Sequence, residues 1–321
     1  MEHTSPETNS PQFSLIVPCY NEESNIGPVL EQIALAMKPF GDYEVLLVDD
    51  RSSDATWMKI QEAAEADPKV KGFRLSRNFG HQAALYAGMS RAAGDAIITL
   101  DADLQHPPQM IPLLIEKWEN GAQVVNTVRR ETEQMPLFKS ITSRLFYKLF
   151  SFLSGFPLEQ GKADFRLMDR VVVDAILDMK ERKPFFRGLI SWMGFSQDQI
   201  EFTAPKRYSG ETKYTLAKMV TLALDGTLSH SYVPIRLSIL AGLLMTLVAV
   251  AYGMYAITIK LFWSQHSGLV PGWASIIALL SLFFGVMYLQ LGLVGEYIAR
   301  IYIEGKTRPI FVIADHTKKQ R

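Results

Sequence analysis

The sequence predicts an α/β domain with a mainly parallel sheet and crossover helices, followed by two membrane-spanning helices. Over residues 13–105, short apolar runs alternate with segments whose apolar residues recur at helical spacing. That alternation is typical of parallel strands joined by helices. Further along the chain, residues 237–259 and 261–295 contain no charged side chain. Soluble helices rarely stay uncharged over such lengths, so these two segments are candidates for the membrane.

Four segments are predicted as strands because each carries an apolar run without polar alternation, which indicates burial on both faces. These strands are expected at residues 13–23, 43–54, 70–76 and 96–105. The intervening segments carry apolar residues at helical spacing and predict helices at 25–40, 55–67 and 80–94.

The overall composition excludes several classes of protein. The 321 residues carry no formal net charge, which argues against a general nucleic-acid binder. Cys19 is the one cysteine, so an internal disulfide framework is impossible and a thiolate metal cluster is not expected. Residues 1–12 are polar and lack the basic and apolar regions of a signal peptide, so we interpret them as a mobile tail.

Two membrane spans are expected at about 235–260 and 272–295, since a spanning helix needs about 20 mainly apolar residues. The alternative is a helical pair buried in a soluble core. The connector 263–273 has no Lys or Arg, although Lys260 lies at its edge. The outer flanks carry Arg236, Arg300, Lys306 and Arg308. By the positive-inside rule, both outer ends and the large N-terminal part are expected in the cytoplasm.

Two further segments, 138–156 and 214–234, combine apolar and aromatic residues with interspersed cations. Helices of this kind lie in the membrane interface. The alternative is that they pack against the core of the α/β domain.

Three of the predicted strands end in polar clusters, "PCYNEE", "VDDRSSD" and "LDADLQ". In open α/β sheets, ligands bind beyond the carboxyl ends of the strands, so these clusters should surround one pocket. Asp101, Asp103 and Gln105 occupy alternate positions and would present oxygens on one side if the chain stays extended. Oxygen ligands of this type suit Mg²⁺ shared with substrate phosphates. Zinc is less expected because no His/Cys set has suitable spacing.

Five motifs together resemble glycosyltransferase family 2, whose fold is called GT-A: "VPCYNEE", "VDDRSSD", "LDADLQHPP", "ADFRLMDR" and "RYSGETKYT". The resemblance covers about 13–313 and is strongest to the polyprenyl-phosphate branch. That branch contains dolichyl-phosphate mannose synthases, bactoprenol glucosyltransferases of the GtrB type and the formamido-arabinose transferase of lipid A modification. The two C-terminal helices and "GLVGEYIARIY" are most similar to the bactoprenol subgroup.

The resemblance implies a nucleotide-binding set at the ends of the strands. It comprises Pro18, Tyr20, Glu22, Asp49, Asp50, Asp101 and the backbone of Ala102. Asp103 and Gln105 match the metal ligands, and the implied cofactor is Mg²⁺ or Mn²⁺.

Asp164 matches the proposed catalytic base of the family. Because a phosphate acceptor is already anionic, Asp164 would mainly orient the acceptor or balance charge. Cations should then lie near the acceptor phosphate or the diphosphate. The candidates are Arg129, Arg130, Arg144, Arg166, Arg207 and Lys213. The alternative for each is a solvated surface charge.

The expected activity is inverting transfer of glucose from UDP-glucose to polyprenyl (undecaprenyl) phosphate on the cytoplasmic face of the inner membrane. GDP-mannose and UDP-formamido-arabinose are the alternative donors, and a non-catalytic membrane scaffold is the rival from another class. The expected organisation is a tail at 1–12, a catalytic domain at 13–213, an interfacial helix at 214–234, a membrane hairpin at 235–295 and a cytoplasmic segment at 296–321. Relatives imply a homotetramer, and the C-terminal "RPIFVIAD" is a candidate strand for pairing with a neighbouring subunit.

Overall fold

The computed structural model describes residues 11–130, 162–179, 181, 184–203, 233–262, 273–306 and 308–317. The predicted interfacial segment 138–156 and residues 214–232 of the segment 214–234 lie outside the described residues, as do Arg144, Arg207 and Lys213. The chain forms two compact units, an α/β domain that includes the C-terminal residues and a helical unit.

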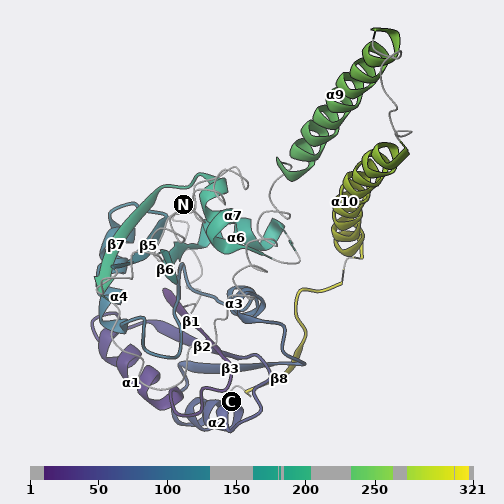
Figure 1. The fold of residues 1–321 in the computed structure, drawn as a ribbon. Helices are drawn as coiled ribbons and strands as arrows, with labels where there is room; N and C mark the ends of the chain where they lie inside the picture. The colour runs from purple at the N-terminus through teal and green to yellow at the C-terminus, as the bar shows by residue number, and fades with distance from the viewer. Residues whose placement is uncertain are drawn as a thin grey trace, which may run out of the picture. The chain divides into compact units, whose positions relative to one another are not determined.

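The α/β domain contains one eight-stranded sheet with the strand order β7-β5-β6-β4-β1-β2-β3-β8 (Figure 1). Four neighbouring pairs are parallel (β1–β2, β1–β4, β2–β3 and β5–β7), and three are antiparallel (β3–β8, β4–β6 and β5–β6). The strands are β1 Phe13–Cys19, β2 Tyr43–Asp49, β3 Val70–Leu75, β4 Ala96–Thr99, β5 Val124–Arg130, β6 Lys162–Asp169, β7 Gln197–Thr203 and β8 Ile313–His316. The mainly parallel GT-A sheet is thus confirmed, with β6 as an antiparallel strand inside it.

Helices cover both faces of the sheet, as the uninterrupted apolar strands predict. Along β1, Leu15 and Val17 pack into one core cluster while Ile16 packs into the other. The first cluster is completed by α1 Ile26–Ala36, α2 Thr56–Ala66 and α4 Ile111–Glu119, and a short 3-10 helix, η1 Pro108–Met110, precedes α4. The second cluster is completed by α3 His81–Met89, α6 Arg170–Met179 and α7 Phe186–Met193. The domain is therefore a three-layer sandwich with a core on each side of the sheet.

Helix α3 lies against β1 at Gly88. A Cβ atom built there would lie 2.3 Å from Cγ2 of Ile16, so this position tolerates no side chain without a shift. This contact fixes the height of α3 over the sheet and sets where its first residue, His81, lies.

The C-terminal strand β8 pairs antiparallel with β3 of the same chain, opposite Phe73 to Leu75. The proposed pairing of this segment with a neighbouring subunit is therefore not what the structure shows. Thr317 continues the contact, because its Oγ1 accepts a hydrogen bond from the Gly72 N–H at 2.9 Å. Residues more than 200 positions apart in the sequence thus share one sheet edge.

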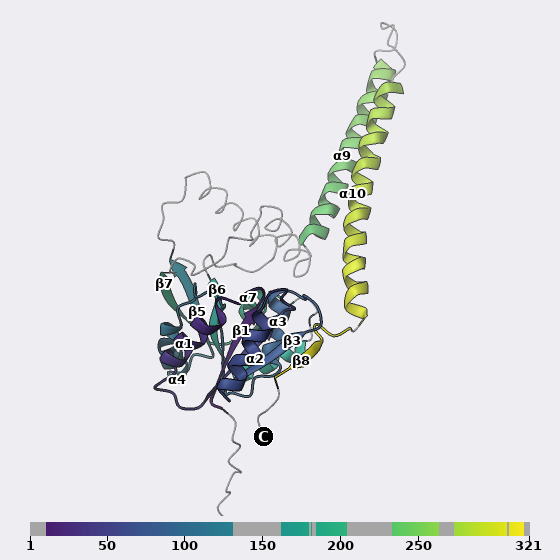
Figure 2. The ribbon, with the colours of Figure 1, turned by 90° about the horizontal axis from the view of Figure 1, so that it is seen from below.

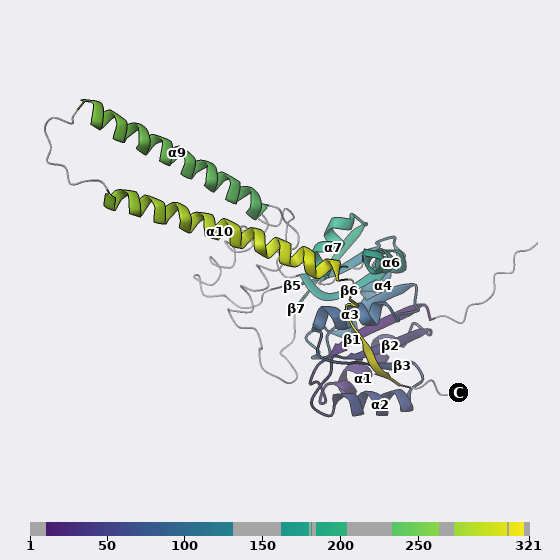
Figure 3. The same ribbon diagram turned by 90° about the vertical axis from the view of Figure 1, so that its right-hand side faces the viewer.

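The second unit contains α9 Val233–Phe262 and α10 Trp273–Gly305, whose ribbons lie alongside each other in Figures 2 and 3. Both helices are long and apolar enough to span a membrane, with mean hydropathy 2.1 over Ile235–Tyr255 and 1.6 over Leu279–Gly305. Neither segment is buried within the protein, which agrees with the two predicted spans rather than with a soluble core. Helix α10 runs to Gly305, beyond the predicted end at 295.

A polar contact between described residues joins the two long helices. Gln290 of α10 donates a hydrogen bond from Nε2 to the backbone oxygen of Ser238 in α9 at 2.8 Å. Gly242 permits this approach, because a Cβ there would lie 3.3 Å from the same nitrogen. In hydrocarbon an amide needs such a partner, so this bond fixes the register of the pair.

Candidate active site

The predicted polar clusters do meet at one edge of the sheet. Strands β1, β2 and β4 are parallel neighbours, so their carboxyl ends lie together. Strand β6 runs antiparallel beside β4, so the beginning of β6 lies at the same edge, with Arg166 opposite Thr99. The hydroxyl of Thr99 donates a hydrogen bond to the Asp164 backbone oxygen at 2.6 Å and holds that strand start in place.

The loops after β1 and β2 are joined by hydrogen bonds. Asn21, whose φ is +55°, donates its backbone N–H to Ser52 Oγ at 2.9 Å. Its side-chain oxygen accepts the Ser53 N–H at 2.9 Å, and the Glu22 N–H donates to Thr56 Oγ1 at 2.8 Å. These hydrogen bonds connect the loops after β1 and β2 into one unit.

Two other members of the predicted nucleotide set differ in exposure. Tyr20 projects from the end of β1 and is exposed, whereas Pro18 is buried within β1 opposite Val48. Tyr20 is therefore the member of this pair that can reach a ligand.

Asp49 and Asp50 are both buried and hold neighbouring segments. Asp49 has no exposed surface, and its Oδ1 accepts the Ser52 N–H at 2.9 Å. Its Oδ2 lies 3.0 Å from Arg74 Nε without hydrogen-bond alignment, so that contact is an ion pair.

Asp50 is 3% exposed, and its two oxygens accept the backbone N–H groups of Phe79 at 2.7 Å and Gly80 at 2.9 Å. Burial raises the pKa of Asp50, although the same two N–H groups oppose the shift. Asp50 thus positions the loop before α3, a structural task that the sequence analysis did not predict.

The segment after β4 turns instead of staying extended. The strand ends at Thr99, and Leu104 adopts a φ of +58°. Asp103 Oδ1 accepts the Gln105 N–H at 3.1 Å, which closes a local turn. The expectation of an extended 96–105 strand is therefore wrong. The intervening apolar residues still pack on one core cluster, namely Leu100, Ala102 and Leu104.

His106 connects this turn to the core of the domain. Its Nδ1 accepts the Asp101 backbone N–H at 3.1 Å, and its ring stacks on Phe165 with centroids 5.5 Å apart. The side chain is buried, with the residue only 8% exposed. Sequence reasoning missed His106. Its position was a signal, because a histidine stands there directly after an acidic motif and two residues before η1 begins.

Asp164 lies in a cluster with two arginines. Its Oδ1 accepts hydrogen bonds from Arg166 Nη2 at 2.9 Å and from Arg187 Nε at 3.1 Å, and its Oδ2 accepts one from Arg187 Nη2 at 3.2 Å. Burial alone would raise the pKa of Asp164, but the charges of Arg187 and Arg166 outweigh burial and hold the pKa well below its usual range. Asp164 is therefore a permanent anion and a weak base.

The two arginines differ in exposure. Arg166 is 3% exposed and also donates to the Ala163 backbone oxygen at 3.0 Å, so the structure pairs it with Asp164 and not with an open surface. Burial lowers the pKa of Arg166 to about 10, which leaves it charged near neutral pH. Arg187 of α7 keeps 39% of its side chain exposed. The sequence analysis missed Arg187, a lone cation within the apolar stretch "PFFRGLISW".

His81, at the start of α3, lies between the two halves of the site. Its Nε2 is 3.6 Å from Asp101 Oδ1 and 3.8 Å from Asp164 Oδ2. The described residues thus bring Asp101 and Asp164 together around one imidazole. Of the other predicted cations, Arg129 lies exposed on β5 opposite Phe202 of β7, and the side chain of Arg130 lies outside the described part of the chain.

The donor set fits an open divalent-cation site. Asp103 and Gln105 supply the hard oxygen atoms that Mg²⁺ and Mn²⁺ prefer, on a partly exposed turn. Among the residues that the structure describes, no group of three or more His, Cys, Asp or Glu side chains could hold a metal by itself. A cation at this turn would therefore need further oxygen ligands from a bound diphosphate and water.

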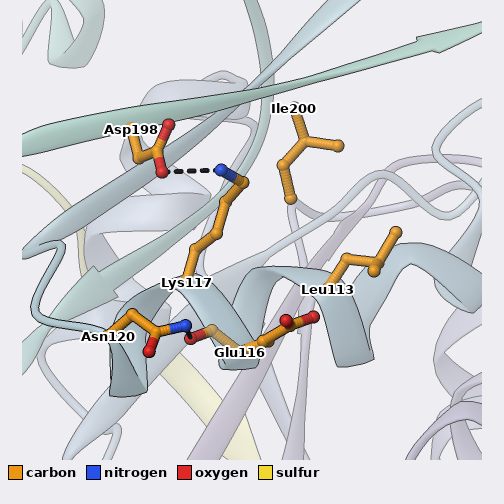
Figure 4. A pocket seen from close by; sticks show the side chains of 6 residues that line it. All are labelled: Leu113, Glu116, Lys117, Asn120, Asp198 and Ile200. Atoms are coloured by element: carbon orange, nitrogen blue, oxygen red, sulfur yellow. Dashed lines mark hydrogen bonds and ion pairs between the residues drawn. The ribbon is translucent and has the colours of Figure 1, made fainter.

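A separate hollow lies between α4 and β7 (Figure 4). An ion pair between Lys117 Nζ and Asp198 Oδ2 at 2.6 Å spans it. Its lining residues are Leu113, Glu116, Lys117, Asn120, Asp198 and Ile200. None of the predicted site residues belongs to it.

Comparisons with known proteins identify the family of the chain. The family model described as "Glycosyl transferase family 2" matches residues 14–177. The chain is 42% identical over 303 residues to the uncharacterized glycosyltransferase YkcC of Bacillus subtilis, covering 94% of this chain and 93% of the relative. It is 37% identical over 310 residues to the bactoprenol glucosyl transferase of Shigella phage SfV, covering 96% and 100%.

Among solved structures, glucosyl-3-phosphoglycerate synthase of Mycobacterium tuberculosis, in complex with Mn²⁺ and UDP-glucose, is 17% identical with a TM-score of 0.46. That similarity covers 69% of this chain and 79% of the other. The family match spans half of this chain, and the relatives match it over nearly their whole length. The chain belongs to glycosyltransferase family 2 and is a glycosyltransferase similar to the bactoprenol glucosyltransferases.

Proposed function

We propose that this glycosyltransferase moves glucose from UDP-glucose to polyprenyl phosphate at the cytoplasmic face of the inner membrane. The turn after β4 carries the sequence Asp101–Ala102–Asp103 and is called the DxD turn below. The observation that carries the proposal is the meeting of Asp101, from this turn, with the Asp164 cluster at one edge of the sheet. A nucleotide-sugar site and an anion-acceptor site would then adjoin. The near full-length similarity to a protein named bactoprenol glucosyl transferase supports the polyprenyl acceptor.

In the proposed reaction, a phosphate oxygen of the lipid attacks the anomeric carbon of the sugar from the face opposite UDP. The new C–O bond forms as the bond to the diphosphate breaks, and UDP leaves with that electron pair. The configuration at the anomeric carbon is inverted. A divalent cation at Asp103 and Gln105 would neutralise charge that builds on the leaving diphosphate.

The chain's own residues suit an acceptor that needs no deprotonation. Asp164 is a weak base, which would disfavour an alcohol acceptor but is harmless for an anionic phosphate. Arg166 and Arg187 both pair with Asp164, and Arg187 is the more exposed of the two. We therefore assign Arg187 to the acceptor phosphate, with Arg207 and Lys213 as further candidates from the family pattern. Asp164 would orient Arg187 and balance positive charge on the sugar.

The helical unit supports a lipid substrate. Two exposed apolar helices agree with membrane attachment, and the cations at the outer flanks favour a cytoplasmic catalytic domain. A polyprenyl chain stays in the bilayer, so the enzyme must act at the membrane surface. A homotetramer remains a proposal by analogy with relatives.

The direct test is transfer of radiolabelled sugar to extracted polyprenyl phosphate by the full-length protein in mild detergent. UDP-glucose, GDP-mannose, UDP-galactose and UDP-formamido-arabinose should be compared, with Asp103→Ala as the control. Labelled lipid with UDP-glucose alone is the expected result. Transfer from another donor would replace glucose in the proposal, and no transfer from any donor would favour a membrane scaffold.

A further inference from the structure

His81 lies in the candidate site, but it has no role in binding the nucleotide, the metal or the acceptor as assigned above. Its side chain is 41% exposed, and its Nε2 lies between Asp101 Oδ1 at 3.6 Å and Asp164 Oδ2 at 3.8 Å. Both distances are slightly longer than a hydrogen bond, so a small rotation of the ring would bring Nε2 within bonding distance of either carboxylate. Asp101 lies in the turn after β4 and Asp164 lies on β6, so the two carboxylates belong to different halves of the proposed site.

Three features fix the backbone at the start of α3, where His81 lies. Asp50, directly after β2, accepts a hydrogen bond from the Gly80 N–H at 2.9 Å and so anchors the residue before His81. Gly80 itself has a φ of +97°, a conformation that favours glycine and turns the chain into α3. The close approach of Gly88 to Ile16 then fixes the helix over β1. The surrounding structure thus determines the location of His81.

The hydrogen bonds of the second imidazole show which histidine can donate to Asp101. His106 Nδ1 accepts the Asp101 backbone N–H, so that nitrogen carries a lone pair and no proton. It therefore cannot donate to the Asp101 carboxylate, although Oδ2 lies only 3.4 Å away. Of the two imidazoles near Asp101 in the described part of the chain, His81 is the one that can present an N–H to its carboxylate.

We propose that His81 is a positioning residue that couples the donor half of the site, through Asp101, to the acceptor half, through Asp164. The proposal rests on the proposed glycosyl transfer. An N–H donor between two carboxylates compensates their mutual repulsion and keeps them at a fixed separation. The anomeric carbon and the attacking oxygen must meet between these halves, so the alignment of the two, and not the affinity of either, depends on His81.

The kinetic test compares His81→Phe with His81→Gln in the full-length protein. Phenylalanine keeps a planar ring but cannot donate, whereas glutamine restores an N–H at a similar reach. We expect His81→Phe to lower kcat about 10- to 100-fold, as a small misalignment of reacting groups does. The Kd for UDP-glucose, measured by calorimetry without acceptor, and the KM for polyprenyl phosphate should stay within about threefold because each half still binds alone.

His81→Gln should recover most of the lost kcat, which a merely space-filling role would not allow. The matched control is His316→Phe, the same substitution at an exposed histidine on β8, with kcat expected at the wild-type value. An unchanged kcat in His81→Phe, or a Kd for UDP-glucose weakened as strongly as in Asp103→Ala, would overturn the proposal.

A second measurement does not depend on turnover. The ring ¹⁵N resonances of His81 should shift in both Asp101→Asn and Asp164→Asn at constant pH, while those of His316 stay in place. A shift in only one variant, or in neither, contradicts the bridging position. If the wild-type protein transfers no sugar from any donor, the proposed function fails, and the ¹⁵N resonances still decide whether His81 joins the two carboxylates.

Discussion

Arg187 donates two parallel hydrogen bonds to Asp164, from Nε at 3.1 Å and from Nη2 at 3.2 Å. The carboxylate comes from β6 and the guanidinium from α7, so the pair joins two elements that are not adjacent in the sequence. A bidentate pair fixes both the charge and the plane of the carboxylate. Asp164 therefore faces the DxD turn as a fixed anion and not as a mobile base.

The first prediction tests this geometry with Arg187→Lys. Lysine keeps the positive charge but loses the planar fork, so the carboxylate is no longer held in one orientation. We expect kcat for sugar transfer to fall about tenfold or more, and the KM for polyprenyl phosphate to rise, because Arg187 is the exposed member of the cluster. The Kd for UDP-glucose should stay near the wild-type value.

Arg91→Lys is the matched control, the same substitution at an exposed arginine after α3. Its kinetics should equal those of the wild type. If Arg187→Lys weakens UDP-glucose binding while the KM for the lipid is unchanged, Arg187 belongs to the donor half and the acceptor assignment is wrong.

The second prediction concerns stability against pH. Asp164→Asn leaves the buried Arg166 without its anion, and we expect a loss of about 3 kcal/mol in the free energy of unfolding at neutral pH. The folded-state pKa of Asp164 lies below its unfolded value, so the carboxylate stabilises the fold above about pH 4 and loses that contribution as the pH falls further.

The difference in melting temperature between wild type and Asp164→Asn should therefore be constant near neutral pH and shrink in acid. The double variant Asp164→Asn/Arg166→Gln, which removes the uncompensated cation as well, should melt above the single variant. A difference that grows as the pH falls would contradict the low pKa of Asp164.

The sequence predicted the strands and helices up to residue 99 well, because each carries its own hydrophobic pattern. It did not predict that β6 inserts antiparallel beside β4, since that pairing depends on contacts far along the chain. The sequence analysis missed His81 and Arg187 for the same reason. Neither residue belongs to a motif with an evident chemical purpose, and only the sheet order brings them to Asp164.

The backbone conformation of the turn after β4 could not be predicted from the sequence for a different reason. The sequence places Asp101, Asp103 and Gln105 at alternate positions, which would present their oxygens on one side of an extended chain. It could not reveal the positive φ of Leu104, because backbone conformation in a short turn depends on local hydrogen bonds such as that between Asp103 and the Gln105 N–H.

The third prediction concerns the metal. Asp103→Ala removes an expected oxygen ligand from a partly exposed turn, so turnover should be abolished while the melting temperature changes by only a few degrees. EDTA should inactivate the wild-type enzyme, and added Mg²⁺ or Mn²⁺ should restore it. Full activity after exhaustive chelation would remove the cation from the mechanism.

The fourth prediction concerns the support beneath the DxD turn. His106→Phe keeps a ring on Phe165 but leaves the Asp101 N–H without its acceptor. Loss of an acceptor for a part-buried donor costs about 1–3 kcal/mol. We expect that loss in the free energy of unfolding, together with weaker UDP-glucose binding by calorimetry because the turn that holds Asp101 and Asp103 loosens. A variant with wild-type stability and affinity would show that the turn needs no such support.

The last prediction concerns the side of the membrane on which the catalytic domain lies. The native thiol is a minor obstacle, because Cys19 is buried in β1 and burial raises its pKa well above the usual value, which suppresses its reactivity. In a Cys19→Ala background, a cysteine introduced as Ser267→Cys in the predicted external loop should react with a membrane-impermeant maleimide added to intact cells. Cysteines introduced as Ser5→Cys and Lys318→Cys should react only after the cells are permeabilised. Strand β8 supports the second half of this expectation, since it joins the C-terminal residues to the sheet that carries the active site, so both must lie on one side. Labelling of Ser5→Cys or Lys318→Cys from outside intact cells would place the catalytic domain outside and would remove its access to a cytoplasmic nucleotide-sugar donor.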